Sequence, residues 1–184
     1  VNVVDGDITQ IEADAMITAI NSGGMWFGGL DGAIQRSSGS MFHGQAQAAM
    51  PLTDGQVVYA PEQGSHKGRF NAVLFVVDDL RKPLYDLVTI ALEGAMRREL
   101  TSVNIPTLRT GVMAGVVEPR NEALISLANA INDFVEKNPG KLDEINIVVY
   151  SNEGDRMLLR TLCDTTYYTP RIKSTAPLLV SGVK

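Results

Sequence analysis

Short apolar runs alternate with longer segments of helical period along this chain, and this alternation restricts the possible folds more than any other feature. Most of the apolar runs are continuous, which is typical of strands that are covered on both faces. We predict strands at residues 2–4, 15–20, 56–60, 72–77, 102–105 and 145–149. The pattern therefore predicts an α/β domain whose sheet is buried between helices.

Four segments carry helix signals. Apolar residues at steps of three and four predict a helix over about residues 83–100, with proline in its first turn. A second apolar stripe predicts a helix over about 121–138 that stops at a Pro-Gly pair. A shorter helix is expected to start near Leu30 and to end at Gly39, and a terminal helix includes residues 157–163.

The length of 184 residues suits one domain. We predict a domain over residues 1–163. A C-terminal tail over 164–184, rich in Ser, Thr and Pro, is expected to be loosely attached or to pack on that domain. We find no internal repeat or linker that would divide the chain further.

Charge and cysteine usage exclude several classes of protein. The chain has 16 Lys and Arg residues against 21 Asp and Glu residues, which gives a net charge of −5. Sequence-independent binding of nucleic acid needs a dominant basic surface, so we expect no nucleic-acid partner. The single cysteine cannot form an internal disulfide, which favours a reducing compartment. No apolar run approaches the roughly 18 to 20 residues of a membrane span, and the first residues lack the features of a signal peptide. We therefore expect a cytoplasmic protein with no membrane partner.

Glycine is concentrated in one region, with seven of its 17 occurrences between residues 23 and 44. The loop at 21–31 follows a predicted strand and enters a helix, and the loop at 109–115 has the same make-up. Backbone N–H groups approach an anion closely where side chains are missing, and a helix N-terminus adds partial positive charge. Either loop alone could be a tight turn, but two together predict a ligand with two phosphates. Neither matches GxxxxGK[ST], and no GxGxxG follows the first strand, which argues against a P-loop nucleotidase and a standard dinucleotide fold.

Three motifs follow one another near the start of the chain: GDIT at 6–9, DAMITAIN at 14–21 and GGLDGAIQR at 28–36. In order and spacing they resemble the macro domain family, which binds ADP-ribose and whose motifs read GDIT, DAIVNAAN and GGGVDGAIHRAAG. The segment 105–115 is similar to the family's second phosphate loop. The resemblance, which covers about residues 1–163, implies a three-layer α/β/α macro domain with a mixed, mostly parallel central sheet.

The resemblance also implies roles for individual residues. Asp7 would accept a hydrogen bond from the adenine amino group with the backbone of Ile8 beside it, although an Asp that caps a turn before Thr9 explains the same residue. Tyr150 and Asn152 are candidates for adenine contact. The diphosphate and distal ribose would be held by backbone N–H groups of Gly28, Gly29, Leu30, Thr110, Gly111, Val112, Met113, Ala114 and Gly115.

Two residues are candidates for catalysis under the same resemblance. Asn21 would hydrogen-bond the distal ribose, and Asp31 would orient or activate a water near the anomeric carbon. An acid in the first turn of a helix is also simply favourable for the helix dipole, so that interpretation of Asp31 stays open. A carboxylate beside a bound phosphate is repelled by the phosphate charge, at a cost of about 1 kcal/mol when the charges are screened as in water. This cost favours a role of Asp31 toward the ribose.

Several positions depart from the family pattern. Thr18 stands in place of the first Asn of NAAN, Ile20 in place of Ala, and Gln35 in place of the His of HR. Trp26 and Phe27 occupy positions that are commonly Gly, where they would stack on the ligand or pack the loop down.

The leading hypothesis is a hydrolase that removes a substituent from the distal ribose of ADP-ribose: an ADP-ribosyl ester to a protein, O-acetyl-ADP-ribose, or ADP-ribose 1″-phosphate, the last a phosphatase reaction. Its partners are then ADP-ribose or an ADP-ribosylated protein. The alternatives are a reader that binds ADP-ribose without turnover, and a degenerate scaffold whose cleft is blocked by Trp26 and Phe27.

The remaining polar residues have structural explanations. The histidines at 43 and 66 lie in polar segments and are expected at the surface; with no CxxC or HExxH motif we expect neither a metal nor a cofactor. Asp78 and Asp79 are expected to be solvated turn residues rather than Mg²⁺ ligands. Cys163 is expected in the core.

Overall fold

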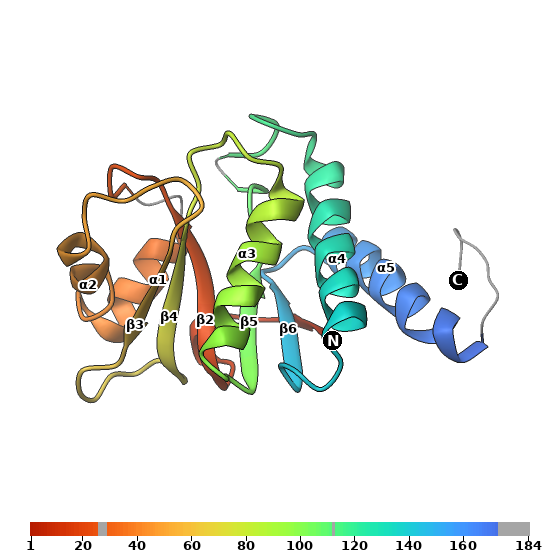
Figure 1. Ribbon diagram of the computed structural model, residues 1–184, viewed down its shortest axis with the longest axis horizontal. Coiled ribbons are helices and arrows are strands. Elements are labelled where there is room, and N and C mark those ends of the chain that lie inside the picture. Colours follow the sequence, from red (N-terminus) through yellow and green to blue (C-terminus); the bar gives the residue numbers. More distant parts are fainter. Residues whose placement is uncertain (26–28, 112, 173–184) are drawn as a thin grey trace.

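The computed structural model describes residues 1–25, 29–111 and 113–172. Its centre is a six-stranded sheet in the order β1-β6-β5-β2-β4-β3 (Figure 1). Neighbouring strands pair in parallel except for β3 and β4, which are antiparallel. The mixed, mostly parallel sheet is therefore confirmed. The strands are β1 (Asn2–Asp5), β2 (Ala13–Ile20), β3 (Val57–Pro61), β4 (Phe70–Val77), β5 (Ser102–Pro106) and β6 (Glu144–Val149).

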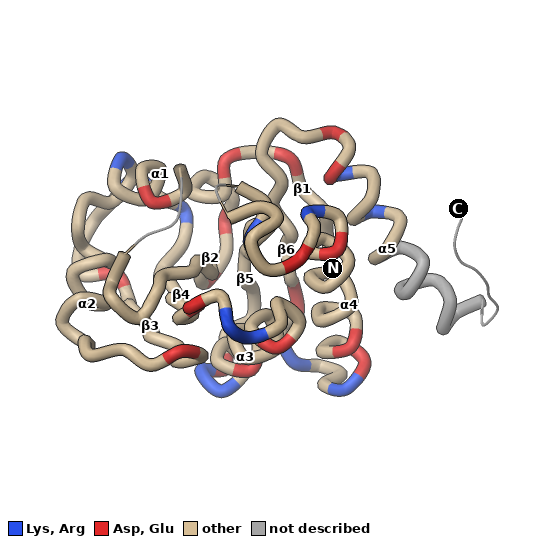
Figure 2. The backbone as a smooth tube through the Cα atoms, turned by 90° about the horizontal axis from the view of Figure 1, so that it is seen from above, with Lys and Arg blue, Asp and Glu red and all other residues tan. Residues whose placement is uncertain are grey.

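Helices cover both faces of this sheet, so the fold has three layers. Helices α1 (Gly29–Ser38) and α2 (His43–Ala48) lie on one face, and α3 (Leu84–Arg97) and α4 (Arg120–Lys137) lie on the other. Figure 2 shows the strands between α1 on one side and α3 and α4 on the other. Helix α5 (Glu153–Ile172) packs against α4 and β1, and a short 3-10 helix, η1 (Ile8–Gln10), follows β1.

Strand β4 shows why the sheet is buried on both sides. Alternate residues point to opposite faces of a strand. Ala72, Leu74 and Val76 join the core beneath α3 and α4, whereas Val73 and Phe75 join the core beneath α1 and α2. All five side chains are almost fully buried. A continuous apolar run is what such a strand requires, as the sequence predicted.

The helix predicted over 83–100 ends three residues early, at Arg97. Glu99 adopts the left-handed conformation, with φ of 58°. The N–H of Leu100 then donates to the carbonyl of Ala95 (3.2 Å), and the N–H of Glu99 donates to the carbonyl of Met96 (2.9 Å). These two bonds form a Schellman motif, which ends the helix while satisfying its last carbonyls.

The core prediction can be checked at Ile17, which lies in the middle of β2 and is fully buried. We expect Ile17→Val to lower the free energy of unfolding by about 1 kcal/mol, because one buried methyl group is lost. Urea unfolding measures this change. Ile125→Val is the matched control, since Ile125 is 37% exposed, and it should change stability by less than about 0.5 kcal/mol. Equal losses in the two variants would contradict the packing described here.

Helix α5 continues to Ile172, over the first part of the segment predicted as a tail. The division of the chain at residue 163 stays a prediction. Cys163 is buried against the core, as predicted. Within the described ranges, no helix combines the length and apolar character that crossing a membrane requires.

The topology places several loops at one edge of the sheet. Parallel strands share the edge at which their carboxyl ends lie, and ligands of such sheets bind there. Gly6 and Asp7 follow β1, the glycine-rich loop follows β2, the segment from Thr107 follows β5, and Tyr150 follows β6. Both predicted anion loops therefore reach the same edge.

Candidate functional site

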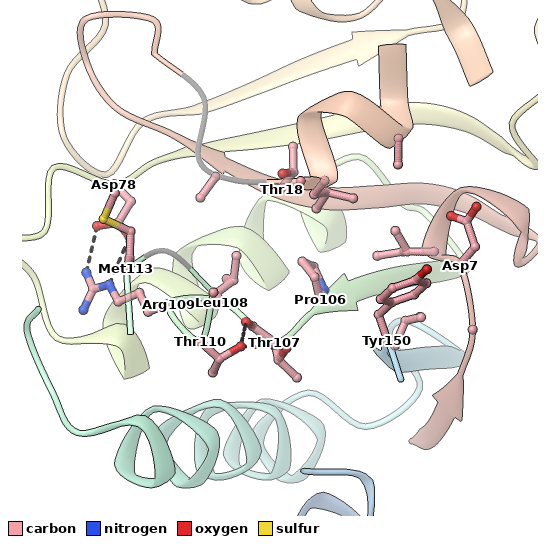
Figure 3. A pocket seen from close by; sticks show the side chains of 18 of the residues that line it. Asp7, Thr18, Asp78, Pro106, Thr107, Leu108, Arg109, Thr110, Met113 and Tyr150 are labelled. Atoms are coloured by element: carbon pink, nitrogen blue, oxygen red, sulfur yellow. Dashed lines mark hydrogen bonds and ion pairs between the residues drawn. The ribbon is translucent and has the colours of Figure 1, made fainter. Parts of the chain in front are cut away.

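A cavity of about 640 Å³ lies at this edge (Figure 3). This volume is within the range of small-molecule sites, roughly 300 to 1,000 Å³. The walls come from the segments that follow β1, β4, β5 and β6, from β2, and from the first two turns of α1. Predicted site residues in the wall are Asp7, Ile8, Gly29, Leu30, Thr110, Gly111, Met113 and Tyr150.

Other predicted site residues lie elsewhere. Among the described residues, those outside the wall of the cavity are Asn21, Asp31, Ala114, Gly115 and Asn152. Gly28 and Val112 lie outside the described residues, as do Trp26 and Phe27, whose predicted stacking or packing is therefore untested. The structure thus assembles the predicted binding loops and leaves the two proposed catalytic residues beside the cavity.

Asp7 and Tyr150 lie at one end of the cavity (Figure 3). The Oδ1 atom of Asp7 accepts hydrogen bonds from the backbone N–H (2.9 Å) and the hydroxyl (2.8 Å) of Thr9. This confirms the capping interpretation of Asp7, which also lines the cavity. Tyr150 is 77% exposed, which leaves the ring accessible for stacking.

Asn21 shapes the first loop. Its Oδ1 accepts hydrogen bonds from the backbone N–H of Gly23 (3.0 Å) and of Met25 (2.9 Å). Asp79 holds the same loop from outside, because its Oδ1 accepts from the N–H of Ser22 (2.8 Å). Asn21 therefore organises the backbone that precedes α1.

The prediction that His43 lies at the surface is wrong. Its side chain is 4% exposed, and its Nε2 lies 2.7 Å from Oδ1 of Asp31. The imidazole also packs against the ring of Phe75, with centroids 5.3 Å apart. The sequence did not reveal this burial for two reasons. Polar residues follow His43, and α2, which starts at His43, is too short to show a periodic apolar pattern. His43 is thus a partner of the candidate catalytic acid that sequence reasoning missed.

The side chain of His66 is also buried, against prediction, and is 3% exposed. Its Nδ1 lies 3.0 Å from the hydroxyl of Ser38 and its Nε2 lies 3.1 Å from Oε1 of Glu62. The imidazole also packs against the rings of Phe42 and Phe70, each with its centroid 5.2 Å away. These contacts tie the loop before β4 to the end of α1.

Burial lowers the pKa of His43 below its usual value of 6.5, and the negative charge of Asp31 offsets part of this shift. The native state therefore binds fewer protons at this residue than the unfolded state. We expect the free energy of unfolding to fall as the pH is lowered through 6.5 toward the pKa of the folded state. Denaturant unfolding between pH 7 and 5 should show this loss, and His43→Gln should reduce the slope. An equal slope in both proteins would contradict the assignment.

Asp78 is not the solvated turn residue that we predicted. It is 2% exposed and lines the cavity. Its two oxygens accept from Nε (3.0 Å) and Nη2 (2.7 Å) of Arg109, which is itself 7% exposed. Nη1 of Arg109 donates to Glu118 (2.9 Å), and Nη2 also donates to the carbonyl of Lys82 (2.8 Å). Burial alone would lower the pKa of Arg109, but the hydrogen bonds to Asp78 and Glu118 outweigh it and raise the pKa.

A second arginine holds the same loop from the side of α4. Nε of Arg120 donates to the carbonyl of Thr110 (3.4 Å), while its Nη atoms donate to both oxygens of Asp155 (2.6 and 2.5 Å). In a trans peptide the carbonyl and the following N–H point in opposite directions. The N–H of Gly111 therefore points away from Arg120, and Gly111 lines the cavity. We therefore expect the N–H of Gly111 to be a donor for an anion in the cavity.

The described ranges contain no group of three or more His, Cys, Asp or Glu side chains arranged to hold a metal ion. The groups that this cavity offers to a ligand include the backbone of Gly29, Leu30, Thr110 and Gly111, the carboxylate of Asp7 and the aromatic ring of Tyr150.

The chain is similar to known proteins in sequence and in structure. No family model matches the chain. A Thermotoga maritima protein named only as uncharacterised is 30% identical over 172 residues; the match covers 85% of this chain and 27% of that protein, so this chain spans about a quarter of that relative's length. The O-acetyl-ADP-ribose deacetylase of Citrobacter rodentium is 28% identical over 174 residues, covering 88% of this chain and 94% of the relative.

The fold is that of a macro domain. The Trypanosoma brucei macrodomain in complex with ADP-ribose superposes with a TM-score of 0.72 at 22% identity, over 85% of this chain and 66% of that one. The chain thus shares its fold with macrodomains and is similar in sequence to an O-acetyl-ADP-ribose deacetylase. The predicted resemblance of the chain to macro domains is thereby confirmed.

Proposed function

We propose that the protein binds ADP-ribose in the 640 Å³ cavity and hydrolyses a substituent on its distal ribose. The observation that carries the proposal is the arrangement of the cavity wall. Asp7 and Tyr150 lie at one end, and the two glycine-containing segments, Gly29–Leu30 and Thr110–Gly111, face the same space. In this proposal the adenine lies beside Asp7 and Tyr150, and the diphosphate lies between the two glycine-containing segments.

At the second loop, backbone donors suit a diphosphate better than the side chain of Arg109 does. Arg109 is neutralised by Asp78 and Glu118, so it supplies no net positive charge to the ligand. The N–H groups at the start of α1 carry the partial positive charge of a helix N-terminus. Fixed donors of this kind also cost little reorganisation when a ligand binds.

For hydrolysis of an ester on the distal ribose we propose that Asp31 takes a proton from a water molecule that attacks the acyl carbon. The bond from the acyl carbon to the ribose oxygen then breaks, so that the carboxylic acid and ADP-ribose are released. Asp31 stands in the first turn of α1, directly after Gly29 and Leu30 in the cavity wall. The imidazole of His43 holds the carboxylate through the 2.7 Å contact, which limits its orientation. Asn21 contributes by holding the loop that precedes α1, and it is the candidate for a hydrogen bond to the ribose.

The substrate class follows from the relatives. A relative covered over 94% of its length is named an O-acetyl-ADP-ribose deacetylase, so O-acetyl-ADP-ribose is the first substrate to test. An ADP-ribosyl ester on a protein carboxylate presents the same kind of bond, and ADP-ribose 1″-phosphate is the third candidate. We propose a cytoplasmic location for these reactions and an ADP-ribosylated protein as the partner.

A reader without turnover is the second candidate. Two observations favour it: Asn21 and Asp31 both lie outside the cavity wall, and both are engaged by protein groups. A reader needs the binding loops and no catalytic group.

Incubation of the protein with O-acetyl-ADP-ribose separates the two candidates. The hydrolase proposal predicts release of acetate and ADP-ribose at a rate proportional to protein concentration. Binding of ADP-ribose without release from any of the three substrates would assign the protein as a reader.

A further inference from the structure

The segment after β5 is held by an ion-pair cluster that the proposed reaction does not use directly. Arg109, Asp78 and Glu118 are brought together from the loop after β5, the end of β4 and the residues before α4. Figure 3 shows the guanidinium turned toward Asp78 at the end of the cavity where Met113 lies, far from Tyr150. We call these three residues the Arg109 cluster.

Arg109 has few donors left for a ligand. A guanidinium has five N–H donors. The structure assigns four hydrogen bonds to it: two to Asp78, one to Glu118 and one to the carbonyl of Lys82. Two carboxylates surround one guanidinium, so the cluster carries a net negative charge. A phosphate would be repelled by the cluster as a whole, which argues against a direct salt bridge between Arg109 and the ligand.

The cluster instead fixes the backbone. Arg109 adopts the left-handed conformation, with φ of 63°, which a residue with a side chain rarely adopts. The planar, bidentate pairing with Asp78 holds the residue in this conformation and anchors it to the end of β4. The next residue, Thr110, has its carbonyl held by Arg120 and its hydroxyl held by the carbonyl of Thr107 (2.6 Å). Residues 107–111 are therefore restrained from both sides.

We propose that Arg109 is a positioning residue for the diphosphate end of the cavity: by binding Asp78, Glu118 and the carbonyl of Lys82 it fixes the backbone of residues 107–111, of which Thr110 and Gly111 supply N–H donors to the ligand. This inference rests on the proposed binding of ADP-ribose. Pre-set donors bind an anion without an ordering cost, so losing the cluster weakens the contacts of the diphosphate and distal ribose. The adenine contacts of Asp7 and Tyr150 stay intact, because they belong to other segments.

The test compares ADP-ribose with AMP by calorimetric titration of the full chain. Arg109→Lys keeps the charge and loses the bidentate fork, and Asp78→Asn keeps the shape and loses a charge. We expect each variant to bind ADP-ribose about tenfold or more weaker, with AMP affinity changed by less than about threefold. Glu118→Gln changes the more exposed partner of Arg109. It should shift the ratio of the affinities for ADP-ribose and AMP in the same direction by a smaller factor, and it replaces the buried variants in the test if either of them does not fold.

Tyr85→Phe is the matched control. It removes the hydrogen bond between Tyr85 and Asp133 (2.5 Å), which joins α3 to α4 away from the cavity wall. It should lower stability and leave the ratio of affinities unchanged. A general loss of stability is thus separated from a loss of positioning.

Each other result overturns the inference. If Asp78→Asn strengthens ADP-ribose binding, Arg109 is a direct ligand that Asp78 had occupied. If the folded variants bind ADP-ribose and AMP in the wild-type ratio, the cluster is only structural. If the wild-type chain does not bind ADP-ribose, the proposed function fails first, and the inference fails with it.

Discussion

Asp31→Asn is expected to lower the turnover of O-acetyl-ADP-ribose by about 100-fold or more, because a positioned general base contributes roughly that factor. Asn keeps the size of the side chain and an oxygen for the contact with His43, so the local packing is preserved. Affinity for ADP-ribose should change by less than about threefold, since the binding loops remain. Steady-state kinetics and calorimetry on the same preparation measure the two quantities.

Asp86→Ala is the control for the simpler explanation of Asp31. Asp86 is also an acid in the first turn of a helix, α3, on the opposite face of the sheet. If Asp31 serves only the helix dipole, both substitutions should cost up to about 1 kcal/mol of stability and leave turnover unchanged. A normal kcat in Asp31→Asn would therefore contradict the proposed mechanism.

Gly111→Val should abolish most of the affinity for ADP-ribose without harming the fold. A Cβ at Gly111 meets no atom within 4 Å, and the residue lines the cavity, so the added side chain enters ligand space. Overpacking of a fitted site costs about 1 to 3 kcal/mol, which corresponds to a loss of about 5-fold to 150-fold in affinity. Calorimetric titration and thermal unfolding check the two parts of this prediction.

Gly44→Val is its control. A Cβ at Gly44 also meets no atom within 4 Å, but Gly44 lies in α2, outside the cavity wall. Binding of ADP-ribose should be unchanged in this variant. If Gly111→Val binds ADP-ribose as the wild type does, the diphosphate does not lie against the second loop.

The architecture was predictable because it follows from local patterns. Continuous apolar runs marked the buried strands, and periodic stripes marked α3 and α4. The motifs placed Asp7, Gly29 and Gly111 in one cavity, since loops at the carboxyl ends of parallel strands must converge.

The interactions behind the site were not predictable, because they join residues far apart in the sequence. Arg109 lies 31 residues from Asp78, and no local pattern pairs them. The polar residues that follow His43 suggested that it is exposed, yet its ring packs against Phe75 of β4. Asp78 and Asp79 were predicted to be solvated turn residues. The prediction failed for Asp78 because its partner, the buried Arg109, comes from another loop.

Titration of the full chain with ADP-ribose tests the central proposal most directly. The cavity predicts saturable heat with one ligand bound per chain, lost or strongly weakened in Gly111→Val and retained in Gly44→Val. An absence of heat at high micromolar ADP-ribose, from protein shown to be folded, would contradict both the hydrolase and the reader, and would leave the fold serving as a scaffold.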